Sequence, residues 1–94
     1  MTNRGQMTPE GIATWMLAEL NRDGILDQAW AAHEIESQFG DEYTPLNMKS
    51  GNLSIRHDVL VAFRRISKET VVWERGERRW RRRERGDVLS RRQN

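Results

Sequence analysis

Arginine is concentrated in residues 75–85, and this concentration indicates a surface that binds anions. Seven of the eleven positions are arginine: 75, 78, 79, 81, 82, 83 and 85. A guanidinium group holds a phosphate with two parallel hydrogen bonds and stays charged at any physiological pH. Successive side chains of a strand point to opposite faces, so about half of these arginines can meet one ligand. We therefore predict that this stretch binds nucleic-acid phosphates.

Two other roles for these arginines stay open. They can cover Trp73 and Trp80 by stacking, or keep an edge strand solvated. They can also bind an acidic protein partner. The two tryptophans suit either a stacking platform for exposed bases or the core, and the valines beside Trp73 favour the core.

No pattern in the sequence is typical of an enzyme. The two histidines, His33 and His57, do not form a His-Glu-x-x-His zinc motif, and no glycine-rich phosphate loop is present. The carboxylates adjoin one another only in sequence, whereas a general acid and base need a shielded pocket. The chain has no cysteine, which excludes disulfides and thiolate metal sites. We therefore predict a non-enzymatic protein without a cofactor or a metal.

The charge of the chain is divided unequally between its halves. Residues 1–48 hold two basic and eight acidic residues, whereas residues 49–94 hold fourteen basic and six acidic ones. This predicts a basic binding face, although the two halves can instead neutralise each other across the fold. No apolar run reaches the roughly 18 residues that span a bilayer, and the start lacks the apolar core of a signal peptide. We expect a cytoplasmic protein with no membrane contact.

The first predicted helix begins after Thr8, a hydroxyl N-cap that precedes Pro9 at the first helical position. Apolar side chains follow at helical spacing between residues 12 and 20. Gly24, free to take a left-handed conformation, ends the helix.

A short strand and a second helix come next. Residues 25–26 suit a strand in a three-stranded sheet, and Asp27 suits the N-cap of a helix. Ala31, Ile35 and Phe39 lie four apart and predict the buried stripe of this helix, which Gly40 ends. Residues 41–54 are rich in turn formers, with a short extended piece near Leu53.

The third predicted helix runs from about His57 to Ser67 and is amphipathic. Its predicted core side holds Ile55, Val59, Leu60, Phe63 and Ile66. Its predicted outer side holds His57, Val61, Arg64, Arg65 and Lys68. This outer side is almost wholly basic.

Residues 70–80 predict a β-hairpin, because two β-prone runs flank Gly76. One register has a loop of residues 74–76 with Gly76 left-handed. The other centres the loop on Arg75-Gly76 and pairs Val71 with Trp80, which places Glu74 opposite Glu77. The residues leave both registers open, and residues 81–85 can extend the second strand.

The predicted order of elements resembles the winged-helix domain over residues 8–83. The run Thr70-Val-Val-Trp-Glu-Arg-Gly-Glu-Arg-Arg-Trp-Arg also resembles a hairpin motif in a family of short bacterial proteins with no assigned function. Winged-helix domains commonly place their third helix in the DNA major groove and the hairpin, or wing, on the backbone. The resemblance implies groove contacts from His57, Arg64, Arg65 and Lys68. It implies wing contacts from Arg75, Arg78, Arg79, Arg81, Arg82 and Arg83.

One departure separates the chain from a tight helix-turn-helix, whose second and third helices are about three or four residues apart. Here residues 41–56 intervene, and they can form an extra hairpin that alters the approach of the third helix.

Together the residues and the resemblance predict an α+β, winged-helix-like domain. It has three helices and a small antiparallel sheet that ends in the hairpin wing. We expect a disordered N-terminus over residues 1–7, the domain over 8–85 and a flexible basic tail over 86–94. The expected partner is nucleic acid, with duplex DNA first, or an acidic protein.

Overall fold

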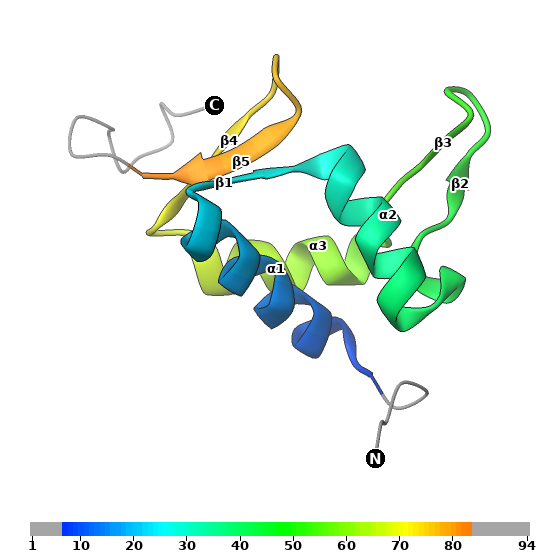
Figure 1. Cartoon of the computed structure of the whole chain (residues 1–94), viewed down its shortest axis with the longest axis horizontal. Helices are drawn as coiled ribbons and strands as arrows, with labels where there is room; N and C mark the ends of the chain where they lie inside the picture. The colour runs from blue at the N-terminus through cyan, green and yellow to red at the C-terminus, as the bar shows by residue number, and fades with distance from the viewer. Residues whose placement is uncertain (1–6, 84–94) are drawn as a thin grey trace.

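The computed structural model of the chain describes residues 7–83 and orders three helices and five short strands along it (Figure 1). The elements are α1 (Pro9–Asp23), β1 (Ile25–Asp27), α2 (Gln28–Phe39), the 3-10 helix η2 (Asp41–Tyr43), β2 (Leu46–Asn47), β3 (Asn52–Leu53), α3 (His57–Ser67), β4 (Val71–Glu74) and β5 (Arg79–Arg82). The predicted tail, 86–94, and all of the predicted N-terminal segment except Met7 lie outside the described residues.

The strands form two antiparallel sheets. The larger sheet has the order β1-β5-β4, so the first short strand pairs with the last one, and β2 pairs with β3 in a separate hairpin. Both hairpins, β4–β5 and β2–β3, extend to the same side of the helices (Figure 1). The predicted α+β class is confirmed, with three helices, a small antiparallel sheet and a C-terminal hairpin.

The predicted helix ends are confirmed at the atomic level. The Thr8 Oγ1 atom accepts a hydrogen bond from the Gly11 N–H at 3.0 Å, and the Asp27 carboxylate accepts one from the Trp30 N–H at 3.0 Å. Gly24 has a φ of +87°, which a side chain would strain, and its N–H bonds the Leu20 carbonyl. Because Asp27 is both the last residue of β1 and the N-cap of α2, it sets where α2 leaves the sheet.

The core lies between the helices and the inner face of the three-stranded sheet. Its largest fully buried side chains are Phe63, Ile12, Met16, Leu20, Ile35 and Val59. One core prediction on α3 is wrong, because Ile66 is 40% exposed and its neighbour Ser67 is buried instead. The Ser67 hydroxyl is satisfied there by donating to the Phe63 carbonyl at 2.6 Å.

Residues 40–56, which separate α2 from α3, hold η2 and the β2–β3 hairpin. Tyr43 anchors this segment, since its ring is buried and its hydroxyl donates to the Met7 carbonyl at 2.5 Å. Burial of the ring raises the pKa of the Tyr43 hydroxyl. The predicted disorder is therefore wrong for Met7, whose side chain also packs against the core.

The hairpin register differs from both predicted registers. Trp73 pairs with Trp80 and Glu74 with Arg79, so residues 75–78 form a four-residue turn. Arg78, with a φ of 54°, takes the left-handed conformation predicted for Gly76. The observed register has a physical reason: it places two aromatic rings opposite each other, and a carboxylate opposite a guanidinium rather than opposite Glu77.

None of the helices in the described part of the chain is long and apolar enough to cross a membrane.

Candidate nucleic-acid interface

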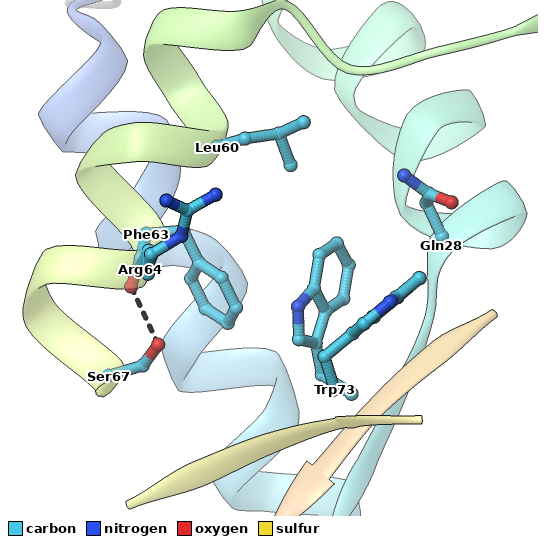
Figure 2. Close-up of a pocket in the computed structure, with 7 residues that line it drawn as sticks. Gln28, Leu60, Phe63, Arg64, Ser67 and Trp73 are labelled. Atoms are coloured by element: carbon cyan, nitrogen blue, oxygen red, sulfur yellow. Dashed lines mark hydrogen bonds between the residues drawn. The ribbon is translucent and has the colours of Figure 1, made fainter. Parts of the chain in front are cut away.

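A cleft of about 280 Å³ separates α3 from the C-terminal hairpin (Figure 2). We call it the α3–hairpin cleft. Its lining comes from α2, α3, β4 and β5, and comprises Gln28, Leu60, Phe63, Arg64, Ser67, Trp73 and Trp80. Segments far apart in the sequence therefore form one concave surface.

Three of the seven residues that line the cleft are aromatic. The Phe63 and Trp80 rings meet edge to face with centroids 5.0 Å apart, and the Trp73 and Trp80 centroids are 4.9 Å apart. Trp80 is only 9% exposed, whereas Trp73 is 37% exposed. Both tryptophans were predicted to lie in the core. This prediction is confirmed for Trp80 and is wrong for Trp73. The difference arises because β4 is an edge strand and β5 is the central one.

Two arginines from separate elements lie around this cleft. Arg64 lines it from α3. Arg78 is tied to the opposite wall, because its Nη2 donates to the Gln28 Oε1 at 3.3 Å and its carbonyl accepts from the Gln28 N–H at 3.0 Å. Within residues 7–83, neither guanidinium has a carboxylate within 4.0 Å.

The exposed side of α3 continues the basic surface beyond the cleft. His57, Val61, Arg64 and Lys68 form one exposed stripe, which we call the outer stripe of α3. Arg65 lies off this stripe, with its Nη2 3.9 Å from the Glu10 Oε2 of α1. In the turn of the hairpin, Arg75 and Arg78 are both exposed.

Arg79 and Arg81 are engaged on the face of the hairpin opposite to Trp73 and Trp80, which we call its outer face. The Glu74 carboxylate accepts from the Arg79 Nε at 2.8 Å and from the Arg81 Nε at 2.6 Å. These two hydrogen bonds hold the pKa of Glu74 below its ordinary value of 4.5. One carboxylate thus neutralises part of the charge that the sequence assigned to ligand binding.

Arg82 and Arg83 serve the ends of helices. The Arg82 Nη2 donates to the Asn21 carbonyl in the last turn of α1 at 2.8 Å, and the Arg83 Nε donates to the Glu69 carbonyl beyond α3 at 3.2 Å. Cations are favourable at helix C-termini, where carbonyls lack partners within the helix. Arg82 and Arg83 therefore connect the sheet to the helices. Arg85 lies outside the described residues.

The ten predicted contact residues accordingly divide into groups. The structure places four exposed cations without a carboxylate partner among residues 7–83 on the outer stripe and in the turn: Arg64, Lys68, Arg75 and Arg78. His57 is exposed at the first turn of α3. Arg65, Arg79, Arg81, Arg82 and Arg83 have partners.

Sequence reasoning missed Gln28 and Leu60 as parts of the site. Gln28 carries no charge and sits one residue after a helix cap, so only its contact with the hairpin turn reveals its place. Leu60 was assigned to the core and instead stands half-buried at the cleft. Within the described ranges, no group of three or more His, Asp or Glu side chains could hold a metal ion.

The chain resembles one recognised protein family along most of its length. A family model described as "Family of unknown function (DUF6953)" matches residues 8–82, which include every helix and strand of the fold. No curated protein and no solved structure matches the chain. The match to the family model covers well over half of the sequence, and the chain belongs to this family of unknown function.

Proposed function

We propose that the chain is a non-enzymatic module that binds duplex DNA through the outer stripe of α3 and the turn at residues 75–78. The observation that carries this proposal is the position of Arg64 and Arg78. They come from separate elements, lie around one cleft and have no carboxylate partner among residues 7–83. Their charges are therefore available to DNA phosphates, which a guanidinium holds with two parallel hydrogen bonds.

The arrangement favours backbone contacts over base reading. The outer stripe of α3 holds only two residues that can read a base edge by the common bidentate contact, Arg64 and Lys68 with guanine, and it has no Asn or Gln, whose amides pair with adenine. Binding dominated by phosphates weakens linearly on a log–log scale as salt rises, with a slope of roughly −0.9 per neutralised phosphate. We expect low sequence specificity and a steep response to salt.

Fluorescence anisotropy with a labelled duplex tests the proposal, at salt concentrations between about 50 and 200 mM. Arg64→Gln and Arg78→Gln should each weaken binding and reduce the magnitude of the salt slope by about 0.9. Arg22→Gln is the charge-matched control, because Arg22 pairs with Asp23 at the end of α1 and does not line the cleft. Absence of binding at low salt, or equal losses in all three variants, would refute the proposal.

A second candidate function is that of a protein-interaction module for an acidic partner. It is favoured by the exposed apolar side chains Trp73 and Val61, which flank Arg64, and by Trp30, which stacks on Trp15 with centroids 6.1 Å apart. Tryptophan and arginine often dominate the free energy of protein interfaces. Co-purification of one acidic protein that survives nuclease treatment would select this function over DNA binding.

A further inference from the structure

We infer that the α3–hairpin cleft is a binding site for a small organic anion, an aromatic ring that carries a carboxylate on a short arm. The inference concerns a ligand that enters between α3 and the hairpin, where Arg64 stands beside Trp73 and Trp80. Binding of this ligand does not require nucleic acid. Competition between this ligand and DNA, however, rests on the proposed function.

The aromatic part of the ligand follows from the lining. Four of the seven lining residues are apolar or aromatic, namely Leu60, Phe63 and the two tryptophans, and Trp73 leaves more than a third of its surface in water. Small-molecule sites are typically apolar concavities of about 300–1,000 Å³ with a few polar groups that orient the ligand. A volume of about 280 Å³ is just below that range, so the ligand has one or two rings.

The negative charge follows from the polar groups that remain available. The Ser67 hydroxyl already donates to the Phe63 carbonyl, and the Gln28 carbonyl oxygen already accepts from Arg78. The Ser67 and Gln28 oxygens keep lone pairs that can accept, but among the described residues that line the cleft only Arg64 carries a formal charge, and the Gln28 amide N–H groups add neutral donors beside it. Among residues 7–83, no carboxylate lines the cleft to favour a cation. Donors around an apolar slot select an acceptor, and a carboxylate matches the fork of a guanidinium.

The Arg64 guanidinium is the contact for both the organic anion and DNA. If Arg64 holds a carboxylate in the cleft, it is not available to a DNA phosphate at the same time. The organic anion therefore competes with DNA, and the cleft makes DNA affinity responsive to a metabolite of this chemical class. A neutral or cationic analogue of the same shape lacks this effect.

The experiment uses three probes of matched shape: 4-phenylbutyrate, 4-phenylbutanol and 4-phenylbutylamine. Each is titrated into the ¹⁵N-labelled full chain without DNA, and the indole N–H signals of the four tryptophans are followed by NMR. We expect a Kd of about 1–10 mM for the anion, with shifts at Trp73 and Trp80 rather than at Trp15. The affinities should fall in the order anion, alcohol, amine.

Two variants, at Arg64 and at Trp73, distinguish the contribution of the positive charge from that of the aromatic ring, and a third serves as the control. Arg64→Gln should lower the affinity for phenylbutyrate by about two- to fivefold, the range of an exposed ion pair, and leave that for phenylbutanol unchanged. Arg65→Gln is the matched control on the same helix and should change neither, because Arg65 faces Glu10. Trp73→Ala should weaken all three probes.

Several outcomes would overturn the inference. These are equal binding of anion and amine, shifts confined to Trp15 and Trp30, or no shift at any concentration up to about 10 mM. Shifts of Trp73 on simple dilution would show that a second copy of the chain occupies the cleft. The DNA proposal is tested separately by anisotropy, where phenylbutyrate should weaken binding and phenylbutylamine should not. Absence of DNA binding would therefore not affect the NMR test of the ligand site, and absence of ligand binding would not affect the test of DNA binding.

Discussion

The arginines of strand β5 and the arginines around the α3–hairpin cleft have different partners. On the outer face, Arg79 and Arg81 both donate to Glu74 at 2.8 and 2.6 Å. Around the α3–hairpin cleft, Arg64 lines the same cavity as Trp73 and Trp80, Arg78 is bonded to Gln28, and no carboxylate lies within 4.0 Å of either guanidinium among residues 7–83. The two paired arginines lie in β5 beside Glu74, whereas Arg64 comes from α3 and Arg78 from the turn, so the place in the fold separates the two kinds of cation.

The comparison shows that the density of arginine in a sequence does not measure the capacity to bind an anion. Arg82 and Arg83 illustrate the point, because they donate to backbone carbonyls at the ends of helices. Such hydrogen bonds organise the fold, although the charges still contribute to the field around it. The fold, and not the number of arginines, determines which guanidiniums are left without a carboxylate partner. Single substitutions around the cleft, on the outer face of the hairpin and on α3 can test this difference.

The largest effect should come from the wall of the cleft. Phe63→Ala removes a ring that is 1% exposed and packs edge to face on Trp80, so it should cost about 3–5 kcal/mol of unfolding free energy. Urea denaturation followed by circular dichroism measures the loss. Ile66→Ala, at a 40% exposed position on the same helix, is the control and should cost clearly less. Equal costs would mean that α3 is rotated about its axis.

The cap of α2 should have the next effect, because it positions Gln28 at the cleft. Asp27→Ala leaves the Trp30 N–H without its partner and should cost about 1 kcal/mol. Thr8→Ala is the control, because it removes the equivalent cap from α1 at a similar cost. Thr8 is far from the hairpin in sequence and does not line the cleft. Only Asp27→Ala should shift the indole signals of Trp73 and Trp80. Identical spectra for the two variants would contradict the role given to α2.

The outer face predicts a specific pH dependence. Because the pKa of Glu74 is lowered in the folded state by Arg79 and Arg81, its contribution to stability is present above the ordinary pKa of 4.5. That contribution is lost as the pH falls through the lowered value. Glu74→Gln should therefore be less stable than the natural chain at neutral pH, and the difference should shrink on acidification. A difference independent of pH in urea titrations would contradict the pairing.

Local features of the fold were predictable because they depend on neighbours in sequence. The Thr8 and Asp27 caps, the left-handed Gly24 and the bounds of α3 all follow from rules that span a few residues. The hairpin register was not predictable from its turn residues alone. It depends on pairing Trp73 with Trp80 while β1 pairs with the far side of β5, a contact between residues more than fifty positions apart.

The candidate site was predictable only in part, for the same reason. The helical period correctly placed Arg64 and Lys68 on an exposed side of α3. It could not show that Arg65 meets Glu10, or that Gln28 reaches Arg78 across fifty residues. Contacts of this kind depend on how helices cross and strands align, and no single segment encodes them.

The smallest effect should come from Arg65, which tests the boundary between paired and available arginines on one helix. Its Nη2 lies 3.9 Å from Glu10, and both side chains are more than 60% exposed, so water screens the pair. Exposed ion pairs contribute about 0–1 kcal/mol. We expect Arg65→Gln to change the unfolding free energy by less than about 0.5 kcal/mol.

The same variant should weaken DNA binding less than Arg64→Gln, because Arg65 lies off the outer stripe and near Glu10, whereas Arg64 lines the cleft. A stability loss above about 1 kcal/mol would show that Arg65 holds α3 against α1 and belongs with the structural arginines. A loss of DNA affinity equal to that of Arg64→Gln would instead extend the binding surface toward α1. The second result would move the boundary between paired and available arginines, because it would show that a cation on α3 does not need to face the cleft to reach DNA.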